Sequence, residues 1–201
     1  MRLYSHQNST FSRRVRIYAL ERNLDLEIVD LDMARRAHRK AEHLGRNPYG
    51  RVPVLEDGDF ILYESLSILS YLENKFTDGA LLPADSQKAA TTDMMLRLCD
   101  NEFANVVTPI YFAKRFLSEK RWNLEDFAER EKRIQKHFAA LAQQLTAGSF
   151  AVNNQFGLVE IAYGPFLWFT HLLEQQLPGA VTHWFKMFKE RDSLVKTDPP
   201  Q

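Results

Sequence analysis

Apolar and polar side chains follow two different periods in the first third of the chain. Short stretches in which they alternate predict strands, and longer stretches with apolar residues three and four apart predict helices. The predicted order is strand, helix, strand, helix, strand, strand and helix, at residues 2–5, 11–22, 24–31, 33–44, 52–56, 60–63 and 65–76. Asp57-Gly58 supplies a hairpin turn between the last two strands. A crossover joins parallel strands and a hairpin joins antiparallel ones, so we expect a small mixed sheet covered by helices.

The rest of the chain shows only helical spacing. A stretch that contains Gly79, Pro83 and Asp85 marks a linker, which we place at residues 77–86. Beyond it, Pro109 is expected to kink the first of four further helices. These helices are predicted at residues 87–117, 124–146, 158–173 and 180–190. The sequence therefore predicts an α/β domain at residues 1–76 and an all-helical domain at residues 87–201.

Composition limits the classes of function. Lys and Arg together number 26, as do Asp and Glu, so the formal net charge is zero and no net basic field favours nucleic acid. The single cysteine, Cys99, cannot form an intramolecular disulfide, and no signal peptide or membrane-length apolar run is evident. The six histidines are scattered and no C-x-x-C pair occurs, which is not a metal-binding pattern. We therefore expect a cytoplasmic protein that binds no membrane, nucleic acid or metal.

Pro53 stands inside a predicted strand, where a proline removes a hydrogen bond of the ladder. One explanation is a cis Val52–Pro53 peptide bond, which would expose the backbone N–H and C=O of Val52 to an extended peptide ligand. The other is an ordinary proline in an edge strand. Both interpretations are open at this point. We predict the cis bond, which is the more informative of the two.

Three further residues have both a capping and a binding interpretation. Ser65 suits the N-cap of the helix at 65–76, and a ligand carboxylate could also bind the free N–H groups there while Glu64 accepts from the ligand's ammonium. Ser9 or Thr10 suits the N-cap of the first helix, and the Ser9 hydroxyl could also donate to a bound thiolate. The basic cluster of Arg13, Arg14 and Arg16 is interpreted as a solvated helix face, with anion steering as the alternative.

Taken together, these positions resemble the glutathione site of serine-type glutathione transferases. The resemblance lies in residues 9–17, in residues 47–55 with Val52-Pro53, and in residues 62–65 with Glu64-Ser65. It extends more loosely over the whole chain, through Leu81-Leu82-Pro83 and residues 156–168. It implies a thioredoxin-like N-terminal domain followed by the all-α domain of that family.

The resemblance also implies individual roles. Ser9 matches the catalytic serine, Val52 the residue that pairs with the cysteinyl backbone of glutathione, and Glu64 and Ser65 the γ-glutamyl binders. Within the same motifs, glutathione binding is implied for Phe11, Arg51 and Pro53. A basic residue near Arg35 often meets the glycyl carboxylate, and Arg36 and Lys40 compete for that role.

The implied activity is conjugation of reduced glutathione to a hydrophobic electrophile by a homodimer. The interface is expected between the first domain of one subunit and the helices near 87–117 of the other. Maleylacetoacetate isomerases are a less similar relative, because they usually carry Ser-Ser-Cys where Ser9-Thr10-Phe11 stands here. The chain also resembles stringent starvation protein A, so the alternative is a non-enzymatic regulator that binds RNA polymerase.

Overall fold

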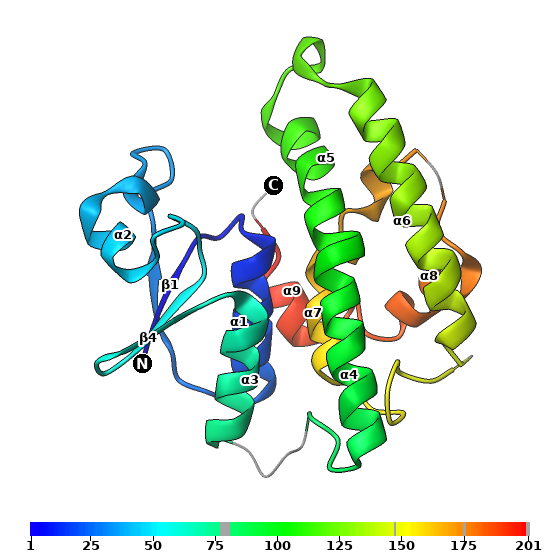
Figure 1. Cartoon of the computed structure of the whole chain (residues 1–201), viewed down its shortest axis with the longest axis horizontal. Coiled ribbons are helices and arrows are strands. Elements are labelled where there is room, and N and C mark those ends of the chain that lie inside the picture. Colours follow the sequence, from blue (N-terminus) through cyan, green and yellow to red (C-terminus); the bar gives the residue numbers. More distant parts are fainter. Residues whose placement is uncertain (77–80, 147, 175, 200–201) are drawn as a thin grey trace. The chain divides into compact units, whose positions relative to one another are not determined.

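The computed structural model describes residues 1–76, 81–146, 148–174 and 176–199 of the chain (Figure 1). Two compact units separate in it. The first comprises Met1–Gly79 together with Arg191–Gln201, and the second comprises Ala80–Glu190. Residues 77–80, the first four of the predicted linker, lie outside the described residues.

The first unit contains a four-stranded sheet with the order β2-β1-β3-β4. β1 and β2 are parallel, whereas β1 with β3 and β3 with β4 are antiparallel, which confirms the predicted mixed sheet. The hairpin turn lies one residue later than predicted, at Gly58-Asp59, because Asp57 still pairs with Phe60. Gly58 has φ +62°, a conformation that glycine adopts at little cost. The strands are β1 (Arg2–Ser5), β2 (Glu27–Asp30), β3 (Val54–Asp57) and β4 (Phe60–Tyr63).

Two long helices of this unit, α1 (Thr10–Glu21) and α3 (Ser65–Phe76), pack against each other. Tyr18 of α1 donates a buried hydrogen bond of 2.6 Å to Glu73 of α3. The single helix predicted at 33–44 is wrong. A short 3₁₀ turn, η1 (Ala37–Arg39), and α2 (Ala41–Arg46) stand there instead, because Arg36 adopts a left-handed φ of 55° that no continuous helix accommodates.

The end of the chain returns to the first unit. Helix α9 (Asp192–Lys196) packs on α1, and the buried Arg13 guanidinium donates to the Leu194 carbonyl (2.8 Å) and to the Thr197 hydroxyl (3.2 Å). Arg191 forms an ion pair with Glu21 of α1 at 2.7 Å. The sequence pattern assigned this segment to the helical domain and predicted no helix in it. The segment packs here because the buried Arg13 guanidinium requires hydrogen-bond acceptors. Such a requirement leaves no periodic pattern in the sequence.

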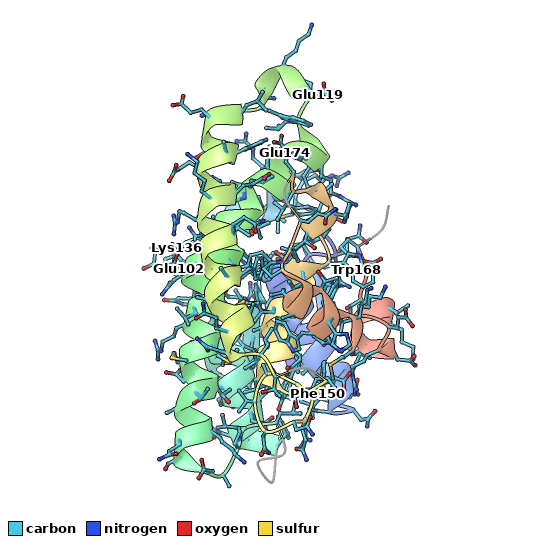
Figure 2. All side chains as sticks on the ribbon, turned by 90° about the vertical axis from the view of Figure 1, so that its right-hand side faces the viewer. Glu102, Glu119, Lys136, Phe150, Trp168 and Glu174 are labelled. Carbon is cyan, nitrogen blue, oxygen red and sulfur yellow. The ribbon has the colours of Figure 1, made fainter. Side chains whose placement is uncertain are left out.

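Every element of the second unit within the described residues is helical, as predicted (Figure 2). The helix predicted at 87–117 is interrupted by a π-helical segment, η2, several residues before Pro109, and such wide turns are a recognised source of helix bends. The helix predicted at 158–173 ends earlier, at Leu167. The elements are α4 (Ser86–Leu98), η2 (Cys99–Ala104), α5 (Asn105–Phe116), η3 (Glu119–Arg121), α6 (Leu124–Gln144), α7 (Leu158–Leu167), η4 (Thr170–Leu172) and α8 (Gly179–Lys186).

All ten residues of α7 are buried, which makes it the centre of the helical unit. Its start is held by Glu160, whose carboxylate accepts from the N–H groups of Gly157 (2.9 Å) and Ala151 (2.7 Å) and from Trp184 Nε1 (2.9 Å). Gly157 therefore serves as the N-cap without a hydroxyl, because the acid at the third helical position reaches back to it.

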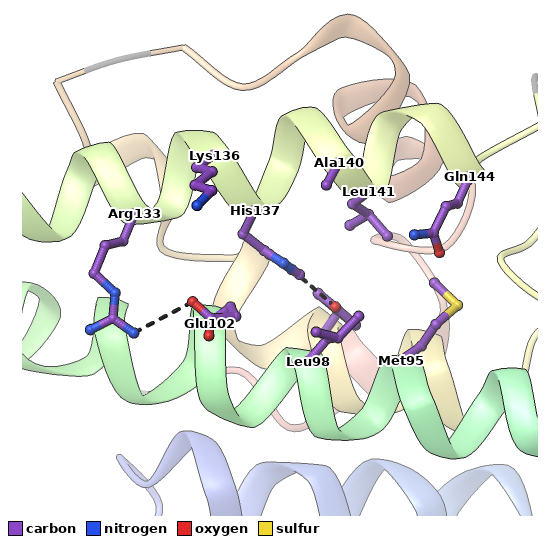
Figure 3. A pocket seen from close by; sticks show the side chains of 10 residues that line it. Met95, Leu98, Glu102, Arg133, Lys136, His137, Ala140, Leu141 and Gln144 are labelled. Atoms are coloured by element: carbon purple, nitrogen blue, oxygen red, sulfur yellow. Dashed lines mark hydrogen bonds and ion pairs between the residues drawn. The ribbon is translucent and has the colours of Figure 1, made fainter.

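A cavity of about 410 Å³ opens between α4, η2 and α6 (Figure 3). On its floor, the buried His137 lies 3.0 Å from the Tyr163 hydroxyl, and at its side Arg133 forms an ion pair with Glu102 at 3.5 Å. Burial lowers the pKa of His137, so its imidazole is neutral near pH 7. The lining consists of Met95, Leu98, Glu102, Arg133, Lys136, His137, Ala140, Leu141, Gln144 and Tyr163.

Candidate functional site

Strand register brings the sequence-predicted segments to one edge of the sheet. Tyr4 pairs with Val54, and Val54 pairs with Tyr63. The chain therefore leaves β1 towards Ser9, enters β3 from Val52-Pro53, and leaves β4 into Glu64-Ser65 at the same edge. These segments are up to 56 residues apart in sequence, between Ser9 and Ser65, and only the pairing of the strands unites them.

Ser9 is the N-cap of α1, as predicted. Its Oγ accepts a hydrogen bond from the Ser12 N–H at 3.2 Å. A serine hydroxyl has one proton and two lone pairs, so this bond leaves the proton available to another acceptor. The preceding turn is fixed by the Ser9 N–H, which donates to the His6 carbonyl at 2.9 Å. The hydroxyl thus lies at the positive end of a 12-residue helix with its proton uncommitted to the cap.

The Val52–Pro53 peptide bond is cis, which confirms the prediction. Within the described residues, neither the N–H nor the C=O of Val52 has a hydrogen-bond partner. The neighbouring Arg51 carbonyl is held by Asn47 Nδ2 (3.0 Å) and lies 2.9 Å from His43 Nε2. The segment that leads into β3 is therefore anchored at Arg51 while the next residue keeps both backbone groups free.

The start of α3 differs from the prediction in one respect. Ser65 is not the N-cap, because the Glu64 carbonyl accepts the first helical bond, from the Ile68 N–H at 3.0 Å. Glu64 itself has φ 73°, which is unusual for a residue with a side chain and costs on the order of 1–3 kcal/mol. The exposed Glu64 carboxylate and the unpartnered N–H groups of the first turn of α3 lie next to each other.

Arg13 and Arg14 are fully buried, so their interpretation as a solvated helix face is wrong. Arg14 Nη1 donates to the Ser65 Oγ at 3.0 Å, and its guanidinium carbon lies 5.3 Å from the centroid of the Phe11 ring. This bond links α1 to the first residue of α3. Arg14 was missed as a site residue, although its spacing of four from Tyr18 places it on the buried stripe of α1.

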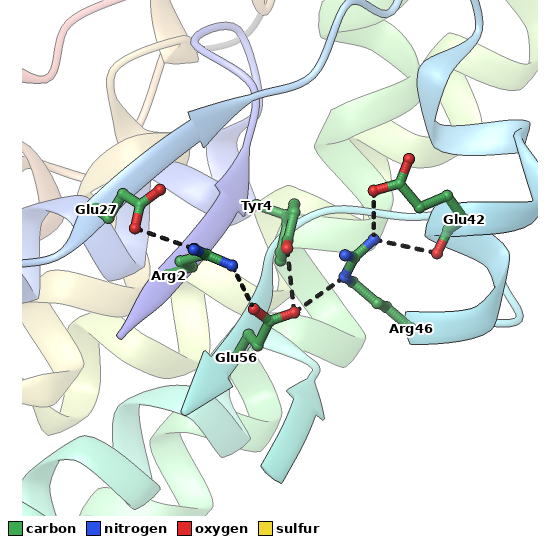
Figure 4. A network of polar contacts seen from close by, with 6 residues as sticks. All are labelled: Arg2, Tyr4, Glu27, Glu42, Arg46 and Glu56. Atoms are coloured by element: carbon green, nitrogen blue, oxygen red, sulfur yellow. Dashed lines mark hydrogen bonds and ion pairs between the residues drawn. The ribbon is translucent and has the colours of Figure 1, made fainter. Parts of the chain in front are cut away.

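A polar network holds α2 against the sheet (Figure 4). Glu56 of β3 accepts from Arg46 Nε at 3.1 Å and from the Tyr4 hydroxyl at 3.1 Å, and the Arg46 guanidinium also lies 4.3 Å from the Tyr4 ring centroid. The hydrogen bond from Arg46 lowers the pKa of Glu56, so this carboxylate stays ionised. The network comprises Arg2, Tyr4, Glu27, Glu42, Arg46 and Glu56.

Arg35 stands apart from these contacts. Its side chain is 84% exposed and pairs with Asp32 at 3.5 Å. By contrast, η1 lies against the segment before Val52, since Arg39 Nη1 is 3.5 Å from the Tyr49 carbonyl. A Cβ on Gly50, whose φ is +60°, would approach the His38 carbonyl to 2.8 Å. The structure therefore brings η1 close to the loop before Val52.

The described part of the chain offers neither a metal centre nor a membrane span. No group of three or more His, Cys, Asp or Glu side chains there is arranged to hold a metal ion. Among the helices so described, none combines the length and the hydrophobicity that crossing a membrane demands.

Comparison with known proteins identifies the family. Residues 3–79 match the model of the glutathione S-transferase N-terminal domain, and residues 125–193 match that of the C-terminal domain. Glutathione S-transferase 1 of Dianthus caryophyllus is 35% identical over 173 residues, which cover 82% of this chain and 75% of the relative. The zeta-class glutathione S-transferase of Euphorbia esula is 31% identical over 186 residues, covering 92% and 77%. The chain belongs to the glutathione transferase superfamily.

Solved structures agree on the fold. Ure2p in complex with glutathione superposes with a TM-score of 0.86 at 19% sequence identity, covering 98% of this chain and 97% of that one. A thioredoxin-like α/β domain followed by a helical domain is therefore the architecture of this protein, as the resemblance implied.

Proposed function

We propose that the protein conjugates reduced glutathione to a hydrophobic electrophile, with Ser9 stabilising the glutathione thiolate. The observation that carries this proposal is that Ser9, Val52 and Glu64-Ser65 meet at one edge of the sheet. Each keeps a hydrogen-bond donor or acceptor available for glutathione. The family relationship supports it.

Each part of glutathione has a partner in this proposal. The N–H and C=O of Val52 pair with the cysteinyl backbone, as an edge strand pairs with an extended peptide. Ser65 and the first N–H groups of α3 receive the α-carboxylate of the γ-glutamyl residue, and Glu64 accepts from its ammonium group. Phe11 and Pro53 line the site beside these groups, and Arg51 positions the backbone of Val52 through its anchored carbonyl.

Ser9 acts on the sulfur. A free thiol has a pKa of about 8.5, so little thiolate exists at pH 7. A hydrogen bond from the Ser9 hydroxyl, together with the positive end of α1, favours the ionised form. The serine stays chemically unchanged, and the thiolate is the nucleophile that attacks the electrophile.

The glycyl carboxylate needs a cation outside the sheet edge. Arg35 is our first candidate, with Arg36 and Lys40 as alternatives from the same segment. The contact of Arg39 with the Tyr49 carbonyl adds a fourth candidate, because it lies beside the loop that precedes Val52.

The proposed hydrophobicity of the electrophile rests on the resemblance to serine-type glutathione transferases.

We also propose a homodimer, because both units expose apolar surface of the kind that subunit interfaces bury. Tyr49 and Phe60 of the first unit are 61% and 47% exposed, and Met94 of α4 is 43% exposed beside the cavity residue Met95.

Sedimentation at micromolar concentration should give twice the chain mass of 23.4 kDa. A Tyr49→Ser, Met94→Glu double variant should shift the protein towards monomer, and a wild type that sediments only as monomer would contradict the proposal.

The decisive experiment for the activity is retention on immobilised glutathione, followed by turnover with a generic aryl halide. We expect both. Glu64→Ala should lose retention, whereas Glu125→Ala removes an acid at the start of α6 and should keep it. Retention without turnover on any electrophile would support a regulator with this fold, and absence of retention would refute glutathione binding altogether.

A further inference from the structure

Arg14 is a buried cation whose charge the proposed reaction does not use directly. It lies in the second turn of α1 with no exposed surface, and its Nη1 donates to the Ser65 Oγ at 3.0 Å. Burying a guanidinium is costly unless its donors are satisfied, so the position of Arg14 is closely tied to its partners. Ser65 is itself only 4% exposed, which fixes this hydrogen bond away from competing water.

The chemistry of the pair sets the direction of the hydrogen bond. A guanidinium has five N–H donors and no acceptor, whereas a hydroxyl can do either. Ser65 must therefore accept from Arg14, and its own proton is left for another acceptor.

A second feature of the same place points to the charge of the acceptor. The Ser65 hydroxyl belongs to the first residue of α3, where the N–H groups of the first turn also lack helical partners. The groups left at this helix start are all donors, and the buried charge of Arg14 adds to the positive potential there. A carboxylate, with a negative charge and two acceptor oxygens, suits these donors better than a neutral amide oxygen, and a cation does not suit them.

We propose that Arg14 is a positioning residue that holds Ser65 as an obligatory hydrogen-bond donor and thereby makes the start of α3 selective for a carboxylate. This inference rests on the proposed function, in which that carboxylate is the α-carboxylate of the γ-glutamyl residue. Arg14 does not touch the ligand in this proposal and acts only through Ser65.

A purely structural role for Arg14 is the competing explanation, since its guanidinium also lies near the Phe11 ring. The two explanations differ in ligand selectivity. A structural role predicts that loss of Arg14 weakens all ligands of the site alike. Positioning of Ser65 predicts a loss confined to ligands that carry the α-carboxylate.

Calorimetric titration with two ligands separates these cases. The first ligand is glutathione, and the second is γ-aminobutyryl-cysteinyl-glycine, which lacks only the α-carboxylate of the first residue. Wild type should prefer glutathione by at least about tenfold, because hydrogen bonds to charged groups are the stronger ones. Arg14→Met and Ser65→Ala should each lose most of this preference, while affinity for the truncated ligand changes little.

The double variant tests the path of the effect. If Arg14 acts only through Ser65, then Arg14→Met combined with Ser65→Ala should lose no more preference than Ser65→Ala alone. Arg13→Met is the matched control, because Arg13 is a neighbouring and equally buried arginine of α1 whose donors meet Leu194 and Thr197. It should lower stability and keep the preference.

Several results would overturn the inference. Full preference in a folded Arg14→Met protein would do so, and so would full preference in Ser65→Ala, which leaves the buried arginine in place. If Arg14→Met does not fold, Arg14→Lys takes its place and should lose part of the preference, because an ammonium group on a shorter side chain cannot reproduce the bond. If the wild type binds both ligands equally, the role of Arg14 is refuted but the proposed function is not. If it binds neither ligand, both the role of Arg14 and the proposed function are refuted.

Discussion

The starts of α1 and α3 in the first unit and the start of α7 in the second solve the same problem in opposite ways. Each helix begins with N–H groups that have no partner within the helix. At α7 a side chain of the protein fills the helix start, because the buried Glu160 accepts from the N-cap Gly157 N–H and from two donors outside the helix, the Ala151 N–H and Trp184 Nε1. At α3 the exposed side chain of Glu64 accepts from no N–H group of the helix start, and at α1 Ser9 accepts from one.

This difference separates a structural helix start from a binding one. Glu160 is 1% exposed and closes its helix to any ligand. Ser9 and Ser65 each accept one hydrogen bond from the protein and keep a proton to donate. Charged or polar residues at a helix start are therefore not informative by themselves. What distinguishes a site is the donor or acceptor that remains after the local bonds are counted.

The largest expected effect is at the closed helix start. Glu160→Ala should lower the free energy of unfolding by about 3–5 kcal/mol, because it leaves one buried and two part-buried donors without an acceptor. Glu64→Ala, at the open start, should change it by less than about 1 kcal/mol, since that side chain is exposed. Urea titrations followed by far-UV circular dichroism measure both. Equal losses in the two variants would remove the distinction drawn here.

Ser9→Ala should act on chemistry more than on binding. We expect conjugation at neutral pH to slow by about 10–100-fold, which corresponds to roughly 1–3 kcal/mol in the transition state, because the thiolate loses one donor. The pKa of the bound thiol should rise, while glutathione affinity is nearly kept. Ser12→Ala is the control, because the Ser12 hydroxyl is buried in the same helix and has no hydrogen-bond partner in the described structure. A pH–rate profile decides, and an unchanged profile for Ser9→Ala would reduce Ser9 to a helix cap.

The closed helix start should also be sensitive to pH. Burial raises the pKa of Glu160 above its ordinary value of 4.5, so the folded state keeps this proton to higher pH than the unfolded chain does. The stability that the acid contributes is thus complete below pH 4.5 and falls as the pH rises through the raised pKa, by at most about 1.4 kcal/mol per pH unit. The difference in unfolding free energy between wild type and Glu160→Gln should shrink over that range. A constant difference would be inconsistent with the raised pKa.

The smallest effect concerns the backbone of Glu64. Glu64→Gly should be more stable than Glu64→Ala by about 1 kcal/mol, because glycine adopts a φ of 73° without the clash of a Cβ. Both variants should lose glutathione affinity to the same extent, since both lack the carboxylate. Thermal unfolding and calorimetry together test this, and equal stability of the two variants would show that the conformation is not strained.

The sequence by itself determined much of the fold. Alternating and helical periods predicted the strand pairs of the first unit, the start of α1 to within a residue and the helical second unit, because these depend on local patterns of burial. The residues of the binding motifs were also recognisable, since Ser9, Val52-Pro53 and Glu64-Ser65 occur in a family-typical order.

Tertiary structure alone decided what depends on distant partners. The hydrogen-bond partners of Arg13 and Arg14 could not be identified from the sequence, because their acceptors lie on α9 and α3, 181 and 51 residues away. The return of residues 191–201 to the first unit accompanies the bonds of Arg13. Ser65 is not the N-cap of α3 because the Glu64 carbonyl accepts the first helical bond. The role of a buried charged side chain depends on the groups that form hydrogen bonds with it, and only the folded chain brings those groups together.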